Sequence, residues 1–298
     1  MTAELVLGTA NFGLRYGIAN NRMLSQREAF AILEKALDVG VCCVDTARGY
    51  GEAEKVLGRF FRVHGKLFDV VTKLPDAEYQ SVEDVERQVN TSLETMGIDQ
   101  IDVLLLHSFK SLDRFKEILL AVLERYVSQG LVGRYGSSAY HPHELETSIE
   151  ISRQDGFQMG AAQFPLNVFD QRFLKNGYLR KLRALDIALY ARSIFLQGLF
   201  FMDFASLRNH FEAAKPRIEE LANLARLYGT SVEALALAFA ASSGVDYVVL
   251  GVDSAAQLEK NAALMAVDAA DLFSKLKSRL EALEVIDETV ILPYKWKH

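Results

Sequence analysis

Short runs of apolar and β-branched residues alternate with longer segments of helical period along the 298-residue chain. Runs such as VCCVDT and DVLLLH are apolar at consecutive positions, which is typical of parallel strands that helices cover on both faces. The pattern predicts eight strands, most of them one strand–helix unit apart, with a wider gap before the last. Their predicted ranges are 4–9, 41–46, 68–74, 101–107, 132–137, 160–164, 186–192 and 247–251.

The segments between these strands carry the signals that begin and end helices. A hydroxyl side chain followed three residues later by Glu or Gln forms a capping box, and glycine commonly ends a helix. In the first of these helices Phe30, Leu33 and Leu37 share one face, and Gly40 follows as the stop. The predicted helix starts are Ser25 with Glu28, Ser81, Ser111, Thr230 with Glu233, and Ser254 with Gln257.

Eight strand–helix units predict an α/β fold, a single (β/α)8 TIM barrel domain spanning residues 1–298. A doubly wound open sheet is the alternative. It is disfavoured because Gly8, Gly13 and Gly17 lack the G-x-G-x-x-G spacing of a dinucleotide-binding loop. Two segments lie outside the eight units: a long loop over 196–214, and an extra helix over 268–283 with the C-terminal tail 284–298. We expect both to lie over an end of the barrel.

Composition and charge narrow the classes of function. Apolar residues make up 50% of the chain and charged residues 24%, which excludes intrinsic disorder. The 39 acidic residues exceed the 33 basic ones, and a net charge of −6 disfavours a non-specific nucleic-acid or anionic-membrane surface. We therefore expect a small-molecule partner, no nucleic acid and no membrane, and the oligomeric state stays open.

The sequence also predicts a cytoplasmic protein. The N-terminal MTAELVLGTANFG lacks the basic segment and the apolar core of a signal peptide. The longest apolar run, over 234–241, is far short of the ~20 residues that cross a bilayer. Cys42 and Cys43 are adjacent on a predicted strand and point to opposite faces, so we expect no disulfide between them, as in a reducing compartment.

Four polar residues stand at or just after three successive strand ends. Asp45, Lys73 and His107 close the second, third and fourth strands, and Tyr50 follows Asp45 by five residues. Each has an ordinary structural role: an Asp caps helices, a loop Tyr packs, a Lys extends to solvent and a rim His accepts a hydrogen bond. In a barrel, however, these four converge on the carboxyl-end mouth, where function gathers.

The chemistry of this set points to proton transfer. A free Tyr has a pKa of ~10 and donates its proton poorly near neutrality. A nearby ammonium lowers that pKa, and a carboxylate beside the ammonium keeps it charged. A neutral His orients a substrate oxygen by donating a hydrogen bond. Such a group protonates an oxygen on which negative charge builds, as in reduction of a carbonyl by hydride from a cofactor.

At these residues the chain resembles the aldo-keto reductases. The stretches that carry the resemblance follow in family order: DTARGYGEAEKVLG, VVTK, DVLLLH, GSSAYHPHEL, AAQFPLN, ARSIFLQGLF and VVLGVDSAAQLEKN. The resemblance implies the same barrel and NADPH or NADH bound in extended form over its mouth. It implies Tyr50 as the general acid in reduction of an aldehyde or ketone, tuned by Lys73 and Asp45, with His107 orienting the carbonyl.

The resemblance also implies the residues that hold the cofactor. Ser138 and Gln163 hold the carboxamide, and Asn261 contacts the adenine. Arg192 stands where the family commonly has a stacking Tyr; it either stacks on the nicotinamide or pairs with an acid at the rim. The full set of implied cofactor contacts is Gly8, Thr9, Ser138, Gln163, Arg192, Gln197, Gly198, Leu199, Gly251, Gln257 and Asn261.

The sequence departs from the family at both ends of the cofactor. Ala139 stands where an Asn often follows the serine. Gly251, Val252 and Gln257 are uncharged where NADPH-specific members place basic residues around the 2′-phosphate. Because a dianionic phosphate favours Arg or Lys, NADH or dual use stays open beside NADPH.

Substrate identity and two other functions stay open. The opening GTANFGLRYGIAN is similar to reductases of sugar metabolism, which favours a sugar-derived carbonyl. On the same fold, an aldolase would form a Schiff base on Lys73, and a nucleotide sensor would keep only vestigial catalysis. No metal site is expected, since His141 and His143 have no Cys or carboxylate at ligand spacing. Four aromatic residues of the long loop either wall the substrate pocket or anchor the loop: Phe200, Phe201, Phe204 and Phe211.

Overall fold

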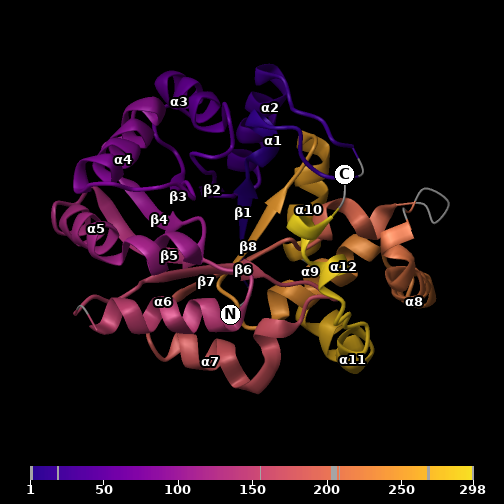
Figure 1. Ribbon diagram of the computed structural model, residues 1–298. Coiled ribbons are helices and arrows are strands. Elements are labelled where there is room, and N and C mark those ends of the chain that lie inside the picture. The colour runs from indigo at the N-terminus through magenta and orange to yellow at the C-terminus, as the bar shows by residue number, and fades with distance from the viewer. Residues whose placement is uncertain are drawn as a thin grey trace.

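A computed structural model describes residues 3–18, 20–154, 156–202, 207, 209–266 and 269–296. Eight parallel strands close into a barrel in sequence order (Figure 1). The predicted (β/α)8 barrel is confirmed, and every strand overlaps its predicted range with ends shifted by at most two residues. The strands are β1 Glu4–Gly8, β2 Cys43–Asp45, β3 Asp69–Leu74, β4 Ile101–Leu106, β5 Val132–Ser138, β6 Ala161–Pro165, β7 Ala188–Arg192 and β8 Tyr247–Gly251.

Helices form a ring around the barrel (Figure 1). The longer ones are α2 Gln26–Asp38, α3 Ala53–His64, α4 Val82–Met96, α5 Phe109–Ser128, α6 Pro142–Gln154, α8 Lys215–Leu227, α9 Val232–Ser242, α10 Ala255–Ala266 and α11 Ala269–Glu281. Shorter pieces are α1 Ala10–Gly13, α7 Tyr178–Arg183, α12 Glu288–Ile291 and the 3₁₀ turns η1 Arg172–Gly177, η2 Leu196–Phe201, η4 Asn209–Ala214 and η5 Pro293–Lys295.

The capping box predicted at the start of α2 is present. The backbone N–H of Glu28 donates to Ser25 Oγ over 3.3 Å, and the N–H of Ser25 donates to the Glu28 carboxylate over 2.8 Å. The buried face is rotated from the predicted one, because Phe30 and Leu37 are only half-buried. The buried residues of this helix are Ala29, Ile32, Leu33 and Ala36.

Two helix starts were placed on the wrong hydroxyl. Ser108, not Ser111, caps α5. Ser111 lies within the first turn of the helix, and its hydroxyl donates to the Asp76 carboxylate over 2.8 Å. Ser231, not Thr230, caps α9. In both regions two hydroxyl residues lie close together in the sequence, and the one that accepts the bond from the first turn has extended backbone. The Ser254 hydroxyl does accept from the N–H of Gln257, as predicted.

The barrel interior is apolar over most of its depth. Its filling side chains are Val6, Val71, Val103, Leu105, Ala161, Tyr190 and Val249. Towards the carboxyl ends of the strands this filling gives way to three buried polar residues, Asp45, Lys73 and Gln163. Buried polar groups are costly unless they are paired, so this layer marks the site.

The extra C-terminal helix lies at the periphery of the fold. α11 packs against α9 on the outside of the helix ring (Figure 1), so the expectation that it covers a barrel end is wrong. Asp268, the predicted first residue, is outside the described residues. The tail instead returns to the rim, where the ring of Tyr294 meets that of Tyr140 edge-on at 4.7 Å.

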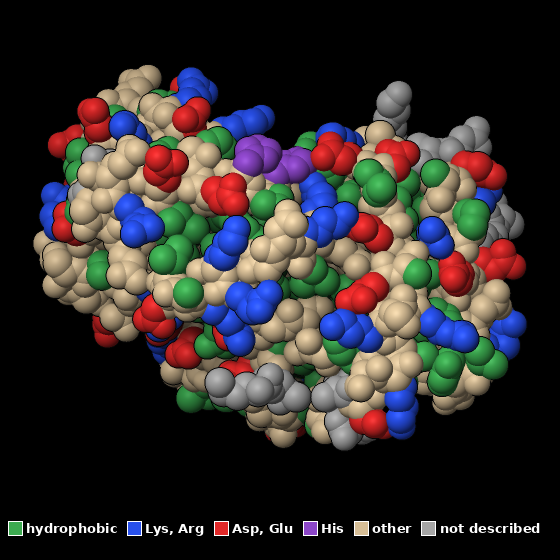
Figure 2. Space-filling model, turned by 90° about the horizontal axis from the view of Figure 1, so that it is seen from below, with side chains coloured by type: hydrophobic (Ala, Val, Ile, Leu, Met, Phe, Trp, Pro, Cys, Tyr) green, Lys and Arg blue, Asp and Glu red, His purple; other side chains and the backbone are tan. Residues whose placement is uncertain are grey.

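In the view of Figure 2, acidic and basic side chains are interspersed over the face with no extended patch of one sign. Among the described residues, no single helix has the length and apolar character to cross a bilayer. One pair of segments, 211–227 with Val232–Ser242, passes that test jointly but is bent by 98°.

Candidate active site

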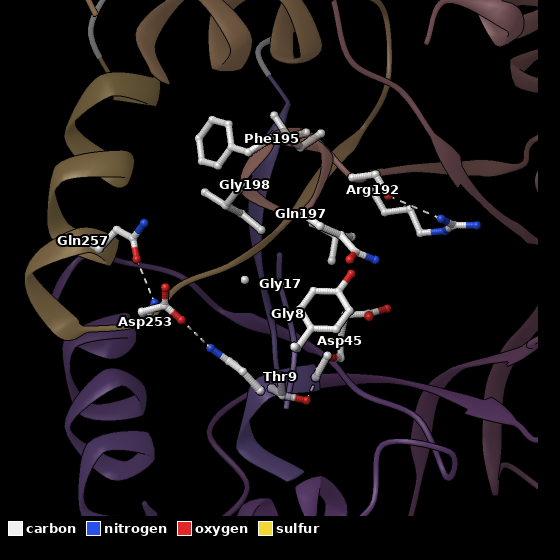
Figure 3. A pocket seen from close by; sticks show the side chains of 18 of the residues that line it. Gly8, Thr9, Gly17, Asp45, Arg192, Phe195, Gln197, Gly198, Asp253 and Gln257 are labelled. Carbon is white, nitrogen blue, oxygen red and sulfur yellow. Dashed lines mark hydrogen bonds between the residues drawn. The ribbon is translucent and has the colours of Figure 1, made fainter. Parts of the chain in front are cut away.

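A cavity of about 520 Å³ opens at the carboxyl ends of the strands (Figure 3). Its lining includes many of the predicted site residues: Gly8, Thr9, Asp45, Tyr50, Gln163, Arg192, Gln197, Gly198, Gly251 and Gln257. The other predicted residues, Lys73, His107, Ser138, Leu199 and Asn261, are not part of this lining. Leu199 is fully buried in the hydrophobic core.

A buried ion pair forms the floor of the site. Lys73 Nζ donates to Asp45 Oδ1 over 2.6 Å, to Asp45 Oδ2 over 2.7 Å and to the Thr46 carbonyl over 2.9 Å. Gln163 Nε2 adds a bond of 2.7 Å to Asp45 Oδ2. Burial lowers the pKa of Lys73, and the Asp45 charge opposes that shift. All three ammonium protons therefore have acceptors, which a buried charge requires.

Tyr50 and His107 lie against this pair. Lys73 Nζ is 5.2 Å from the centroid of the Tyr50 ring, and the rings of Tyr50 and His107 meet edge-on at 5.8 Å. The four residues proposed from the strand ends thus come together in space.

The Tyr50 loop is held in place by close backbone packing. A Cβ on Gly13 would lie 2.0 Å from the carbonyl oxygen of Tyr50, so only glycine lets α1 approach the loop this closely. The N–H and the hydroxyl of Thr9 both donate to the Asp45 carbonyl, over 2.9 and 3.0 Å, and tie β1 to β2 beneath the site.

The environment fixes the protonation states of the phenol and the imidazole. Burial raises the pKa of the Tyr50 phenol above its ordinary value, Asp45 adds to the shift, and Arg192 opposes it. Burial, Lys73 and Arg192 together lower the pKa of His107 to about 4. At neutral pH the phenol therefore keeps its proton and the imidazole is uncharged. The expected lowering of the phenol pKa does not occur, because burial dominates and the Asp45 charge adds to it.

A second buried carboxylate holds the loop between β2 and α3. Glu54 is only 2% exposed and accepts from Arg48 over 2.9 Å, from Thr72 over 2.7 Å and from Ser92 over 2.9 Å. Arg48 and Glu54 flank Tyr50 in sequence, so this cluster anchors both sides of its loop. The sequence pattern does not reveal it, because a Glu in the first turn of a helix is ordinarily solvated.

Arg192 packs on an aromatic ring rather than on an acid. Its guanidinium lies 4.3 Å from the centroid of Tyr140, and its Nη atoms reach Ser193 Oγ and the Ala139 carbonyl at 3.4 Å. Among the described residues no carboxylate forms an ion pair with it, so the rim ion pair left open by the sequence does not form. Ser138 lies next to this group and is in register with Gln163 of β6.

Three buried polar atoms near the cavity have no hydrogen-bond partner: Asn11 Oδ1, Gln163 Oε1 and Asn261 Nδ2. Such atoms are costly unless a ligand satisfies them. Gln163 lines the cavity, and its free Oε1 is an acceptor for an amide N–H, so Gln163 fits the carboxamide of the nicotinamide cofactor that the sequence implies. Asn261 is buried and does not line the cavity, so its contact with the adenine stays a prediction.

The segment after β1 crosses the cavity and was missed by sequence reasoning. The N–H of Ile18 donates to the Gln197 carbonyl over 3.0 Å, and Asn20 Nδ2 donates to Asp253 over 2.7 Å. Gly17, directly before Ile18, lines the cavity (Figure 3). This segment links the loop after β7 to the loop after β8.

The aromatic residues of the long loop divide between two roles. Phe200 packs edge-on against Phe169 at 4.7 Å, and Phe211 packs against Trp296 at 5.0 Å, so both anchor the loop. Phe201 is 42% exposed and lines the cavity. Phe204 is outside the described residues.

The remaining candidate chemistry lies away from the cavity. Cys42 and Cys43 are free thiols. His141 Nδ1 is 3.0 Å from an Arg172 nitrogen, which is a contact that disfavours a metal ion. Within the part of the chain that the structure describes, no group of three His, Cys, Asp or Glu side chains is placed to hold a metal.

Comparison with known proteins assigns the chain to a protein family. The sequence pattern of the Aldo/keto reductase family matches residues 4–275. D-threo-aldose 1-dehydrogenase from a Pseudomonas species is 26% identical, over 89% of this chain and 93% of its own. L-glyceraldehyde 3-phosphate reductase of Escherichia coli K12 is also 26% identical, over 86% and 84%.

Solved structures share the fold. An aldo-keto reductase from Bacillus halodurans, solved in its holo form, superimposes with a TM-score of 0.78 at 18% identity, covering 99% of this chain and 96% of that one. A putative aldo-keto reductase from Pseudomonas aeruginosa gives a TM-score of 0.62 at 21% identity, covering 90% and 92%.

Proposed function

This chain is a member of the aldo/keto reductase family, and on that basis we propose that it reduces an aldehyde or ketone to an alcohol with Tyr50 as the general acid. The observation that supports this most is the buried Asp45–Lys73 pair directly beneath Tyr50 and His107 at the cavity. The family implies NADPH or NADH as the hydride source.

The site residues divide the work of proton transfer. The neutral His107 donates a hydrogen bond that orients the carbonyl oxygen of the substrate. Tyr50 transfers its phenolic proton to that oxygen as negative charge builds on it, so one O–H bond breaks and the O–H bond of the alcohol forms. When bound, the nicotinamide supplies the hydride to the carbonyl carbon. Arg192 favours the phenolate that remains, since its charge lowers the pKa of Tyr50.

Other residues of the chain would hold the cofactor. Gln163 has a free Oε1 for the carboxamide while its Nε2 is fixed on Asp45. Gln197 and Gly198 line the cavity between its two ends. Asn261 has a free Nδ2 for the adenine. We propose Ser138 as a second contact to the carboxamide, because Ser138 of β5 pairs with Gln163 of the neighbouring strand β6.

The proposed substrate is a small sugar-derived carbonyl compound. Two relatives are named for an aldose and for glyceraldehyde 3-phosphate, which are small hydroxylated carbonyl compounds. The catalytic end of the cavity offers Tyr16, Arg192 and Gln197 as hydrogen-bonding groups, which suits a polar substrate better than an aromatic one.

The experiment that tests the proposal is Tyr50→Phe. We expect loss of turnover over a panel of aldoses and short aldehydes, with the affinity for the oxidised cofactor unchanged in calorimetry. Tyr228→Phe is the control, because it removes the hydroxyl of an exposed Tyr that does not line the cavity. Full activity of the Tyr50 variant would refute the assignment of the acid.

The two rival functions have distinct outcomes. A Schiff base on Lys73 needs a free amine, whereas Lys73 is 1% exposed with three acceptors around Nζ. Trapping of a substrate adduct by borohydride would support the aldolase. A sensor would bind the cofactor and turn over none of the panel.

We further propose that the protein is cytoplasmic and that it binds neither nucleic acid nor membranes. Cell fractionation and binding assays with duplex DNA and anionic vesicles test them, and light scattering would give the oligomeric state.

A further inference from the structure

The cavity carries opposite charge at its two ends (Figure 3). Arg192 stands at the catalytic end, near Asp45. The far end is formed where β8 passes into α10, and it carries the carboxylates of Asp253 and Glu233. Among the described residues that line the cavity, Arg192 is the only Lys or Arg, so the far end has no lining cation.

The Asp253 carboxylate is fixed in position by amides. Its Oδ1 accepts from Asn11 Nδ2 over 3.2 Å, and its Oδ2 accepts from Asn20 Nδ2 over 2.7 Å. Its backbone N–H donates to Gln257 Oε1 over 2.7 Å. Asn11 is itself buried and held by the Val252 carbonyl over 2.8 Å. Neutral donors orient the carboxylate without cancelling its charge, and no cation in the described part of the chain forms an ion pair with it.

The one lysine nearby in sequence is already committed. Lys260 Nζ lies 2.7 Å from the carboxylate of Glu233. That pairing leaves Lys260 facing Glu233 rather than the Asp253 carboxylate.

One cavity joins the two ends, since its lining includes Tyr50 and Gln163 as well as Gly251, Asp253 and Gln257. A dinucleotide with its nicotinamide beside Tyr50 and Gln163 would therefore place its adenosine half towards the Asp253 end. A ribose 2′-hydroxyl donates a hydrogen bond to a carboxylate, whereas a 2′-phosphate brings a second negative group against it. The Asn11 oxygen without a partner accepts from a hydroxyl or an amine, and not from a phosphate.

We propose that Asp253 selects NADH over NADPH by accepting the 2′-hydroxyl of the adenosine ribose and repelling a 2′-phosphate. This inference rests on the proposed function, because it assumes that the cavity holds a nicotinamide dinucleotide. It identifies a specificity residue beyond the positions Gly251, Val252 and Gln257, whose lack of charge left the preference open.

Calorimetric titration of the intact protein tests the inference without any turnover. The probes are NAD⁺ against NADP⁺, and 5′-AMP against 2′,5′-ADP as fragments that report on the adenosine end alone. We expect NAD⁺ and 5′-AMP to bind at least about tenfold more tightly than their phosphorylated partners, and the ratio to shrink as salt screens the repulsion.

Three variants make the assignment specific. Asp253→Asn and Asp253→Ala should each reduce the preference in affinity for NAD⁺ over NADP⁺ by about tenfold, mainly through tighter NADP⁺ binding. The second variant keeps the test decisive if the first does not fold. Glu259→Gln is the matched control. It removes an exposed carboxylate of α10, the helix that follows Asp253; this carboxylate pairs with Lys35 and does not line the cavity.

The outcomes separate this inference from the function on which it rests. Equal or tighter binding of NADP⁺ by the wild-type protein would overturn the inference alone. An unchanged ratio in both folded Asp253 variants, or the same change in Glu259→Gln, would overturn it too. Binding of neither dinucleotide would overturn the proposed function and this inference together.

Discussion

Replacing Asp45 by Asn tests how the site is held together. The carboxylate and Lys73 are 3% and 1% exposed, and their contacts are 2.6 and 2.7 Å. Breaking a buried pair by neutralising one partner leaves an uncompensated charge, which costs about 3–5 kcal/mol of unfolding free energy. With an unfolding entropy of about 2.1 cal/mol/K per residue, this predicts a fall in Tm of about 5–8 °C for 298 residues.

A second variant separates lost charge compensation from lost contacts. In Asp45→Asn with Lys73→Met, both charges are absent and the methionine keeps most of the volume of the lysine. Replacing a buried pair by neutral groups is often close to neutral for stability. We therefore expect the double variant to regain at least half of the loss in Tm.

Scanning calorimetry of the four members of this cycle is the assay, with Glu220→Gln as the control. That control breaks an exposed ion pair with Arg217 and should move the Tm by less than about 1 °C. The claim that charge compensation stabilises the site would be refuted if Asp45→Asn had the Tm of the wild type. It would also be refuted if the double variant had a Tm no higher than that of Asp45→Asn.

Three further predictions concern the loop and the imidazole. Gly13→Ala should cut kcat by about 100-fold, because its Cβ meets the Tyr50 carbonyl at 2.0 Å; steady-state kinetics check this. Glu54→Gln should lower kcat by about tenfold with cofactor affinity unchanged in calorimetry, because Arg48 loses its charged partner beside the Tyr50 loop. Because the pKa of His107 falls from its ordinary 6.5 to about 4, the unfolded chain binds this proton more readily between those values. The free energy of unfolding should therefore drop by up to about 3 kcal/mol from pH 6.5 to 4, and His107→Gln should flatten that part of a denaturation series.

The strands were predictable because their signal is local and repeated. A strand covered on both faces is a run of apolar residues, and eight such runs fit few architectures other than a closed barrel. Helix starts were less certain, because Ser108 and Ser111 offer the same side chain and only the backbone path selects between them.

The approach of the candidate catalytic residues was predictable for a geometric reason. Parallel strands deliver their end residues to one rim, so Asp45, Lys73 and His107 had to approach one another. The sign of the Tyr50 pKa shift was not predictable in the same way. It depends on how deeply the phenol is buried and on the Asp45 charge beside it, and the spacing of the residues reveals neither the burial nor the balance between the two.

The far end of the cavity shows what the strand-end rule leaves out. Asp253 stands two residues after β8, so the same reasoning that selected Asp45 applies to it. It escaped attention because its partners Asn11 and Asn20 come from the other end of the chain and donate from neutral amides, a combination with no sequence signature. The bond from Asn20 Nδ2 to Asp253 Oδ2 joins residues 233 positions apart, so no local pattern in the sequence could have indicated it.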